Sequence, residues 1–138
     1  MLGRRRPAAM SPALQKVLEG FRSTVALVER AKAEVVAAAP TGRGPGRPVA
    51  EALAAFEAFL AEARSTMPAW RSRPFDADWT ACSRALDETG RRAELLRLEG
   101  SPAGYEELYG VLGDLLEPLE AFGVARDRFG RRSFGPRD

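Results

Sequence analysis

Four segments of the chain carry apolar residues at the alternating three- and four-residue spacing of an amphipathic α-helix. We place these helices at about residues 12–39, 48–66, 76–99 and 101–129. Ser11-Pro12 and Ser101-Pro102 are typical helix starts, because serine is a good N-cap residue and proline suits the first helical position. Four helices with one apolar face each predict an all-α protein, an up-down four-helix bundle.

The apolar positions define the expected core. They are Leu14, Leu18, Phe21, Val25, Val28 and Val35; Val49, Leu53, Phe56, Leu60, Ala63 and Met67; Phe75, Trp79, Cys82, Leu86, Thr89, Ala93 and Leu96; and Tyr105, Leu108, Leu112, Leu115, Leu119, Phe122 and Phe129. Lys32 takes one position of the first stripe. Gly90 should destabilise the third helix by about 1 kcal/mol relative to alanine, and Pro118 should kink the fourth.

The chain has 138 residues, which suffices for one domain with its own core. We assign residues 11–129 to the bundle and residues 1–10 and 130–138 to irregular basic tails. The N-terminus lacks the apolar run of a secretory signal, and no segment approaches the roughly 18 apolar residues of a membrane span. We therefore expect a cytoplasmic protein without membrane association. Its 19 arginines against two lysines indicate a GC-rich, bacterial genome.

Histidine is absent, and cysteine occurs once, as Cys82. Ser-His-Asp and Cys-His catalysis are therefore excluded, as are di-iron bundles that use Glu-x-x-His motifs, and tetrahedral zinc lacks ligands. We assign no catalytic residue and expect no cofactor. A single cysteine excludes an intrachain disulfide and fits a reducing compartment. Because Cys82 lies on an apolar stripe where no basic residue flanks it, we expect a buried, unreactive thiol.

The stretch "TGRGPGRP", residues 41–48, is rich in glycine, proline and arginine. A phosphate-binding loop would need lysine and serine or threonine after the last glycine, and a preceding strand. Here Arg47-Pro48 follow, and the flanking segments are helical. The Arg-Gly-Arg-Pro core of an AT-hook is interrupted by Pro45-Gly46, so no DNA-binding function is assigned to it. We interpret the stretch as the connection between the first two helices.

The fourth helix carries carboxylates on one side, among them Glu106, Asp114 and Glu117. Such residues are suitable ligands for Mg²⁺, so one alternative function is a Mg²⁺-dependent hydrolase that acts on a phosphate compound. These residues lie off the apolar stripe, and no acidic pair occupies an inward position on another helix. The other interpretation is therefore a solvated face, where aspartate and glutamate usually lie.

Small residues on the second and fourth helices allow close contact with a further helix. They are Ala50, Ala54, Ala58 and Ala61, with Gly110 and Gly113. A homodimer through these residues is one interpretation, and an alanine-rich exposed surface is the other.

In an up-down bundle the N-terminus, the connection at residues 68–74 and the C-terminus lie at the same end. Ten of the 21 basic residues then gather there: Arg4, Arg5, Arg6, Arg71, Arg73, Arg126, Arg128, Arg131, Arg132 and Arg137. Trp70, Phe129 and Phe134 alternate with them. Arginine beside aromatic residues is typical of protein-binding hot spots and of nucleic-acid contacts.

We therefore expect a non-catalytic binding or adaptor module that uses this basic aromatic end or an apolar helix face and binds a protein partner or an anionic partner. The residues expected to bind it are Trp70, Arg71, Arg73, Arg126, Arg128, Arg131 and Arg132. A nucleic-acid-associated protein that uses the same end is an alternative. The remaining interpretation gives this end no binding role, with Trp70 covering the core and solvated basic tails around it.

Overall fold

The computed structural model describes residues 11–38, 48–99 and 105–134, without the side chains of residues 105–108. It contains four long helices and two short 3-10 turns. These are α1 (Pro12–Ala37), α2 (Val49–Thr66), η1 (Met67–Trp70), η2 (Arg73–Phe75), α3 (Asp76–Glu99) and α4 (Tyr105–Phe134). No strand occurs in this part of the chain, so the predicted all-α fold is confirmed. None of the described helices has the length and apolar character needed to cross a membrane.

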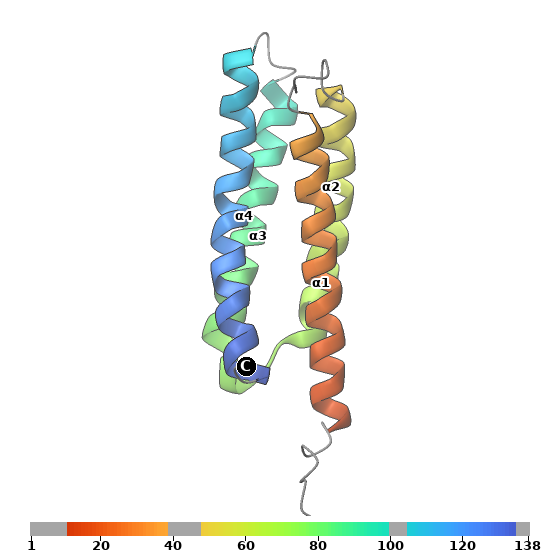
Figure 1. The fold of residues 1–138 in the computed structure, drawn as a ribbon, viewed down its shortest axis with the longest axis vertical. Helices are drawn as coiled ribbons and strands as arrows, with labels where there is room; N and C mark the ends of the chain where they lie inside the picture. Colours follow the sequence, from red (N-terminus) through yellow and green to blue (C-terminus); the bar gives the residue numbers. More distant parts are fainter. Residues whose placement is uncertain (1–10, 39–47, 100–104, 135–138) are drawn as a thin grey trace, which may run out of the picture.

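The helices run alternately up and down as an antiparallel bundle (Figure 1). α1 packs on α2, and α3 on α4, much more extensively than α2 packs on α3 or α1 on α4. The bundle is therefore built from two helical hairpins, each made of neighbours in sequence. η1 and η2 connect the hairpins at the end where α1 begins and α4 ends.

The start of α1 follows the expected capping pattern. The Leu14 backbone N–H donates a hydrogen bond of 3.1 Å to Ser11 Oγ, and Pro12 takes the first helical position. The second expected cap, Ser101-Pro102, lies outside the described residues. α4 continues through Pro118 without ending there.

α4 also extends to Phe134, beyond its expected end near residue 129. The Phe134 ring lies 5.7 Å from the Phe21 ring and 6.2 Å from the Phe129 ring, measured between centroids. This packing favours continued helix, because it buries an aromatic side chain that a solvated tail would expose. The first residues of the expected C-terminal tail are therefore helical.

The apolar stripes of α2, α3 and α4 form the core as predicted. Fully or almost fully buried members are Phe56, Leu60, Ala63, Met67, Cys82, Leu86, Thr89, Ala93, Leu112, Leu115, Leu119, Phe122 and Phe129. The expected stripe residues Tyr105 and Leu108 have side chains outside the described part.

The stripe of α1 differs from the predicted one at the positions of Val25 and Lys32. Lys32 was expected on it but is exposed, whereas Thr24 and Ala31 are fully buried and Val25 is only half-buried. At two positions the inward residue is therefore one earlier in the sequence than expected: Thr24 in place of Val25, and Ala31 in place of Lys32. Ala31 fits there because its small side chain allows close packing, and Lys32 gains hydration by pointing outward.

Thr24 can be buried because its hydroxyl group has hydrogen-bond partners inside the core. Trp70 Nε1 donates to Thr24 Oγ1 at 2.8 Å, and the Thr24 hydroxyl lies 3.1 Å from the Gly20 carbonyl oxygen that it can donate to. The hydroxyl of Thr66 also contacts that of Thr24. This polar network joins α1, α2 and η1 inside the core, where an unpaired polar group would be destabilising.

An aromatic cluster closes the core at the end that holds η1 and η2. Its members are Phe21, Trp70, Phe75, Trp79, Phe129 and Phe134. The Trp70 ring centroid lies 4.7 Å from that of Phe129 in an edge-to-face arrangement. Because its members come from both hairpins and from η2, the cluster fixes this end of the bundle.

Gly20 permits a close approach between α1 and η1. A Cβ atom at this position would lie 3.0 Å from Ala69 Cβ and 3.3 Å from both the Ala69 carbonyl carbon and Trp70 Cδ1. Only glycine leaves room for this contact, which brings the Trp70 indole within reach of Thr24.

Candidate functional site

Six of the predicted arginines lie in the described part of one end of the bundle. We call this group the basic end; it consists of Arg71, Arg73, Arg126, Arg128, Arg131 and Arg132. Arg71 and Arg73 lie in and beside η2, and the other four lie in the last turns of α4, which ends close to η2 (Figure 1). The residues Arg4, Arg5, Arg6 and Arg137 lie outside the described residues.

Trp70 is not exposed at the basic end. Its side chain is 0% exposed and its indole N–H is bonded to Thr24. Trp70 therefore covers the core, as one of the sequence-based interpretations held, and supports the surface from below. Trp79, which was assigned to the core, is half-buried and reaches this surface instead.

Arg71 is held in place from two directions. Its Nε atom donates to Asp76 Oδ1 at 3.0 Å, and its guanidinium carbon lies 4.6 Å from the centroid of the Trp79 ring. The Trp79 indole is fixed in turn, because its Nε1 donates to the Met67 carbonyl oxygen at 2.9 Å. The ion pair and the cation–π contact together orient the guanidinium group.

Two further arginines of the basic end have carboxylate partners. Arg126 lies 3.7 Å from Glu29 on α1 and 3.7 Å from Asp127. Arg132 Nη1 lies 3.6 Å from Oδ2 of Asp78, whose side chain is almost fully buried. That oxygen has no hydrogen-bond partner among the described residues, so the guanidinium group of Arg132 compensates its charge.

Arg73, Arg128 and Arg131 form a second group at the same end. All three side chains are exposed, and none forms an ion pair with the described residues. Arg71, Arg73 and Asp76 line a hollow of about 600 Å³ at this surface. The basic end thus combines oriented, paired guanidinium groups with unpaired ones.

The carboxylates of α4 whose side chains are described are exposed to solvent, and some of them form ion pairs. Asp114 and Glu117 are exposed, and Glu117 Oε1 lies 3.3 Å from Arg92 Nη2 of α3. Arg92 also donates to the Asp114 carbonyl oxygen at 2.9 Å, which fastens α3 to α4. The side chain of Glu106 lies outside the described part. Among the described residues, no three acidic or cysteine side chains are grouped as metal ligands.

Arg92 takes part in a small ionic network on α3. Its Nε atom lies 2.8 Å from Glu88 Oε2, and Arg91 Nη2 lies 2.6 Å from the same oxygen. Hydrogen bonds from Arg91 and then Arg92 lower the pKa of Glu88 to about 2.

Cys82 is fully buried on α3. Burial, followed by the negative charge of Asp78 one turn earlier, raises the pKa of its thiol to about 12. The thiol stays protonated at neutral pH, which agrees with the predicted packing role.

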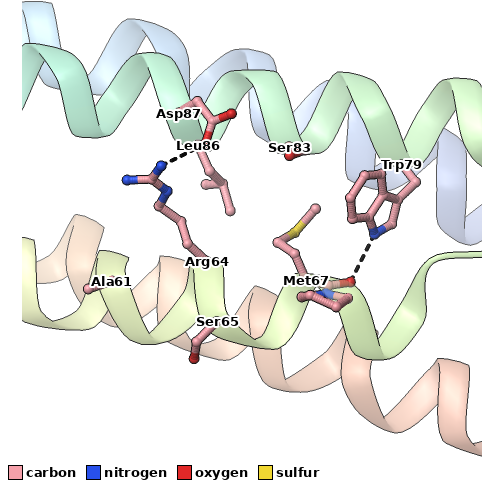
Figure 2. A pocket seen from close by; sticks show the side chains of 9 residues that line it. Ala61, Arg64, Ser65, Met67, Trp79, Ser83, Leu86 and Asp87 are labelled. Carbon is pink, nitrogen blue, oxygen red and sulfur yellow. Dashed lines mark hydrogen bonds and ion pairs between the residues drawn. The ribbon is translucent and has the colours of Figure 1, made fainter.

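A groove between α2 and α3 was not foreseen from the sequence. It has a volume of about 470 Å³, and Arg64 crosses it to bind Asp87 at 2.9 Å (Figure 2). A Cβ atom on Gly90 would lie 2.9 Å from Arg64 Nη1, so this glycine makes room for the guanidinium group. The glycine inside a helical stretch was the sequence signal for this contact.

The small residues proposed for a homodimer lie on the surface. Ala50, Ala54, Ala58 and Ala61 are exposed on α2, and a Cβ atom on Gly110 or Gly113 would meet no atom within 4 Å. They do not contribute to packing within the described bundle, and the homodimer stays a prediction.

No protein-family model, no curated protein sequence and no solved structure matches this chain.

Proposed function

We propose that the protein is a non-catalytic binding module that holds an acidic segment of a partner protein at the basic end. One observation carries the proposal: Arg73, Arg128 and Arg131 are exposed at this end without an ion pair to the described residues. Unpaired guanidinium groups gathered on one surface raise the local potential and attract carboxylates.

The rigidity beneath the arginines supports this function. Arg128 precedes the fully buried Phe129, and Arg71 follows the fully buried Trp70. Both aromatic residues belong to the aromatic cluster, so the backbone that carries these arginines is fixed before a partner arrives. Binding then requires less ordering of the protein, and more of the interaction energy is available for affinity.

The arrangement of acidic groups favours a protein segment over nucleic acid. Asp76 and Asp127 lie among the arginines, and their side chains are 48% and 61% exposed. A nucleic-acid strand carries a negative charge at every nucleotide and would be repelled at these positions. An acidic protein segment can place carboxylates opposite the arginines and neutral side chains opposite the aspartates.

The test compares a variant that lacks the three unpaired arginines with a control variant that lacks the same amount of charge elsewhere on the surface. The test variant carries Arg73→Gln, Arg128→Gln and Arg131→Gln. The control variant carries Arg30→Gln, Lys32→Gln and Arg84→Gln, three exposed positions on the sides of the bundle. Each protein is immobilised and incubated with nuclease-treated lysate, and retained proteins are identified by mass spectrometry. We expect acidic proteins to be retained by the original and control proteins and lost from the test variant.

The strongest retained protein is then purified and titrated with each variant. We expect the test variant to bind at least about tenfold more weakly, with much of the change in the association rate. Equal retention by the test variant would contradict the proposal. Binding that requires intact nucleic acid in the lysate would favour the nucleic-acid alternative instead.

A further inference from the structure

Arg71 differs from the other arginines of the basic end in which of its N–H donors already have a hydrogen-bond partner. A guanidinium group has five N–H donors, one on Nε and two on each Nη. The Nε donor of Arg71 is bonded to Asp76, and the face of the group lies over Trp79. The two Nη atoms have no hydrogen-bond partner among the described residues. Their paired donors form a planar fork whose orientation is already set.

A fork of this kind matches a particular ligand geometry. Two parallel N–H donors fit the two oxygens of a carboxylate or of a phosphate, and the bidentate contact is stronger than a single ion pair. Arg71 also lines the hollow of about 600 Å³, together with Arg73 and Asp76. The hollow therefore offers oriented donors together with space for a ligand group.

The local charge selects between the two anions. Arg71 and Arg73 with Asp76 leave one net positive charge at the hollow. A carboxylate carries one negative charge and neutralises it, whereas a phosphate monoester carries roughly −1.5 to −2 at neutral pH. The excess charge of the phosphate would face the exposed Asp76 carboxylate. The hollow is thus matched to a side-chain carboxylate.

We infer that Arg71 is the anchor of the basic end and binds one glutamate or aspartate side chain of the partner through its two Nη groups. Asp76 and Trp79 act as positioning residues, because they hold the guanidinium group without occupying the fork. Arg73 adds charge beside it. This inference rests on the proposed function and adds the residue and the ligand group that give it geometric selectivity.

The test uses the complete chain and a decaglutamate peptide as the probe. Arg71→Lys keeps the charge but loses the planar fork, so we expect it to weaken peptide binding by about fivefold or more, nearly as much as Arg71→Ala. Arg73→Lys should change the affinity by less than about twofold, since Arg73 acts through its charge. Arg30→Lys, on the side of α1, is the matched control and should have no effect.

A second measurement follows the site directly in the original protein. The side-chain Nε–H signal of Arg71 and the indole signal of Trp79 are assigned by nitrogen-15 NMR. Both should shift when the peptide is added, because the bound carboxylate contacts the guanidinium group that lies over the indole. A peptide of equal length that contains phosphoserine in place of glutamate is the comparison. Arg71 should contribute no more to the affinity for this peptide than it contributes to the affinity for decaglutamate.

The outcomes separate this inference from the proposed function. Failure of the original protein to bind the peptide would overturn both. One result would overturn only the role of Arg71 as the anchor. In it, peptide binding is lost when Arg73, Arg128 and Arg131 are replaced, but Arg71→Lys leaves it unchanged and the Arg71 signal does not shift. A phosphoserine peptide that binds more tightly, in a manner dependent on Arg71, would overturn the choice of carboxylate.

Discussion

Trp70 Nε1 donates a 2.8 Å hydrogen bond to the hydroxyl oxygen of Thr24, and both side chains are fully buried. Through this contact η1, which begins the connection between the two hairpins, is attached to the middle of α1. The contact therefore positions the Trp70 indole, which packs against Phe21, Trp79 and Phe129 in the aromatic cluster.

Replacement of Thr24 by valine keeps the side-chain shape and removes that hydroxyl. The Trp70 indole N–H would then be buried without an acceptor, so we expect the free energy of unfolding to fall by about 1–3 kcal/mol. Urea denaturation followed by circular dichroism measures the change. Ser23→Ala, at the exposed neighbouring position, is the control and should alter stability by less than about 0.5 kcal/mol. Equal effects of the two substitutions would contradict the role given to Thr24.

Two glycines should respond in opposite ways to alanine. At Gly20 the added Cβ would lie 3.0 Å from Ala69 Cβ and 3.3 Å from the backbone of η1, so α1 and η1 must move apart. We expect Gly20→Ala to destabilise the protein by about 1–3 kcal/mol. At Gly113 the Cβ would meet no atom within 4 Å. Gly113→Ala should therefore stabilise α4 by up to about 1 kcal/mol. Thermal unfolding of both variants checks the signs, and a stabilised Gly20→Ala would exclude the close contact.

Glu88 should contribute to the loss of stability in acid. Hydrogen bonds from Arg91 and Arg92 lower its pKa in the folded protein from 4.5 to about 2. The stabilisation is therefore present above pH 4.5 and is lost as the pH falls toward 2. Glu88→Gln should reduce the difference between the urea midpoints measured at about pH 5.5 and at about pH 2.5, which together cover most of this range. Glu62→Gln, at an exposed position of α2, should leave the difference unchanged. An unaltered pH profile for Glu88→Gln would count against the network.

The pair formed by Asp78 and Arg132 should show energetic coupling. Arg132→Gln removes the nearest positive charge from a carboxylate that is almost fully buried, and we expect a loss of about 1–2 kcal/mol. The loss stays below that of a fully buried pair because the Arg132 side chain is 62% exposed. With Asp78→Asn already present, Arg132→Gln should have much less effect, which a double-mutant cycle measures. Arg131→Gln is the exposed control, and additive single effects would show that Arg132 does not compensate Asp78.

The sequence was sufficient to predict the helices, their antiparallel order and most of the core. Periodicity worked on α2, α3 and α4 because their inward positions are occupied by apolar residues such as Phe56, Leu86 and Leu115. It was less accurate on α1, where Thr24 is buried in place of the expected Val25. A threonine is accepted there only because a tryptophan from a distant turn provides a hydrogen bond, and a periodic pattern contains no such information.

The gathering of arginines at one end followed from topology, but their pairing did not. Whether Arg71 is stacked on Trp79, or Arg132 reaches Asp78, depends on side-chain positions on different elements. The same limit applies to Gly90: helix propensity predicts only a destabilising effect on α3, whereas a Cβ atom there would lie 2.9 Å from Arg64 Nη1 of α2. Trp70 was placed at the correct end and lies in the core beneath the arginines.

The division of the bundle into two hairpins has a consequence for the order of folding. Each hairpin joins helices that are neighbours in sequence, so its loop closes at a low entropic cost, and we expect both to form early. The aromatic cluster joins Phe21 of α1 to Phe129 of α4, which come from opposite parts of the chain, and should assemble after the rate-limiting step. Phe129→Leu should accordingly accelerate unfolding in stopped-flow experiments while the refolding rate stays nearly the same. A partner bound across η2 and α4 would hold the last-formed contacts together, and so would lengthen the lifetime of the native protein.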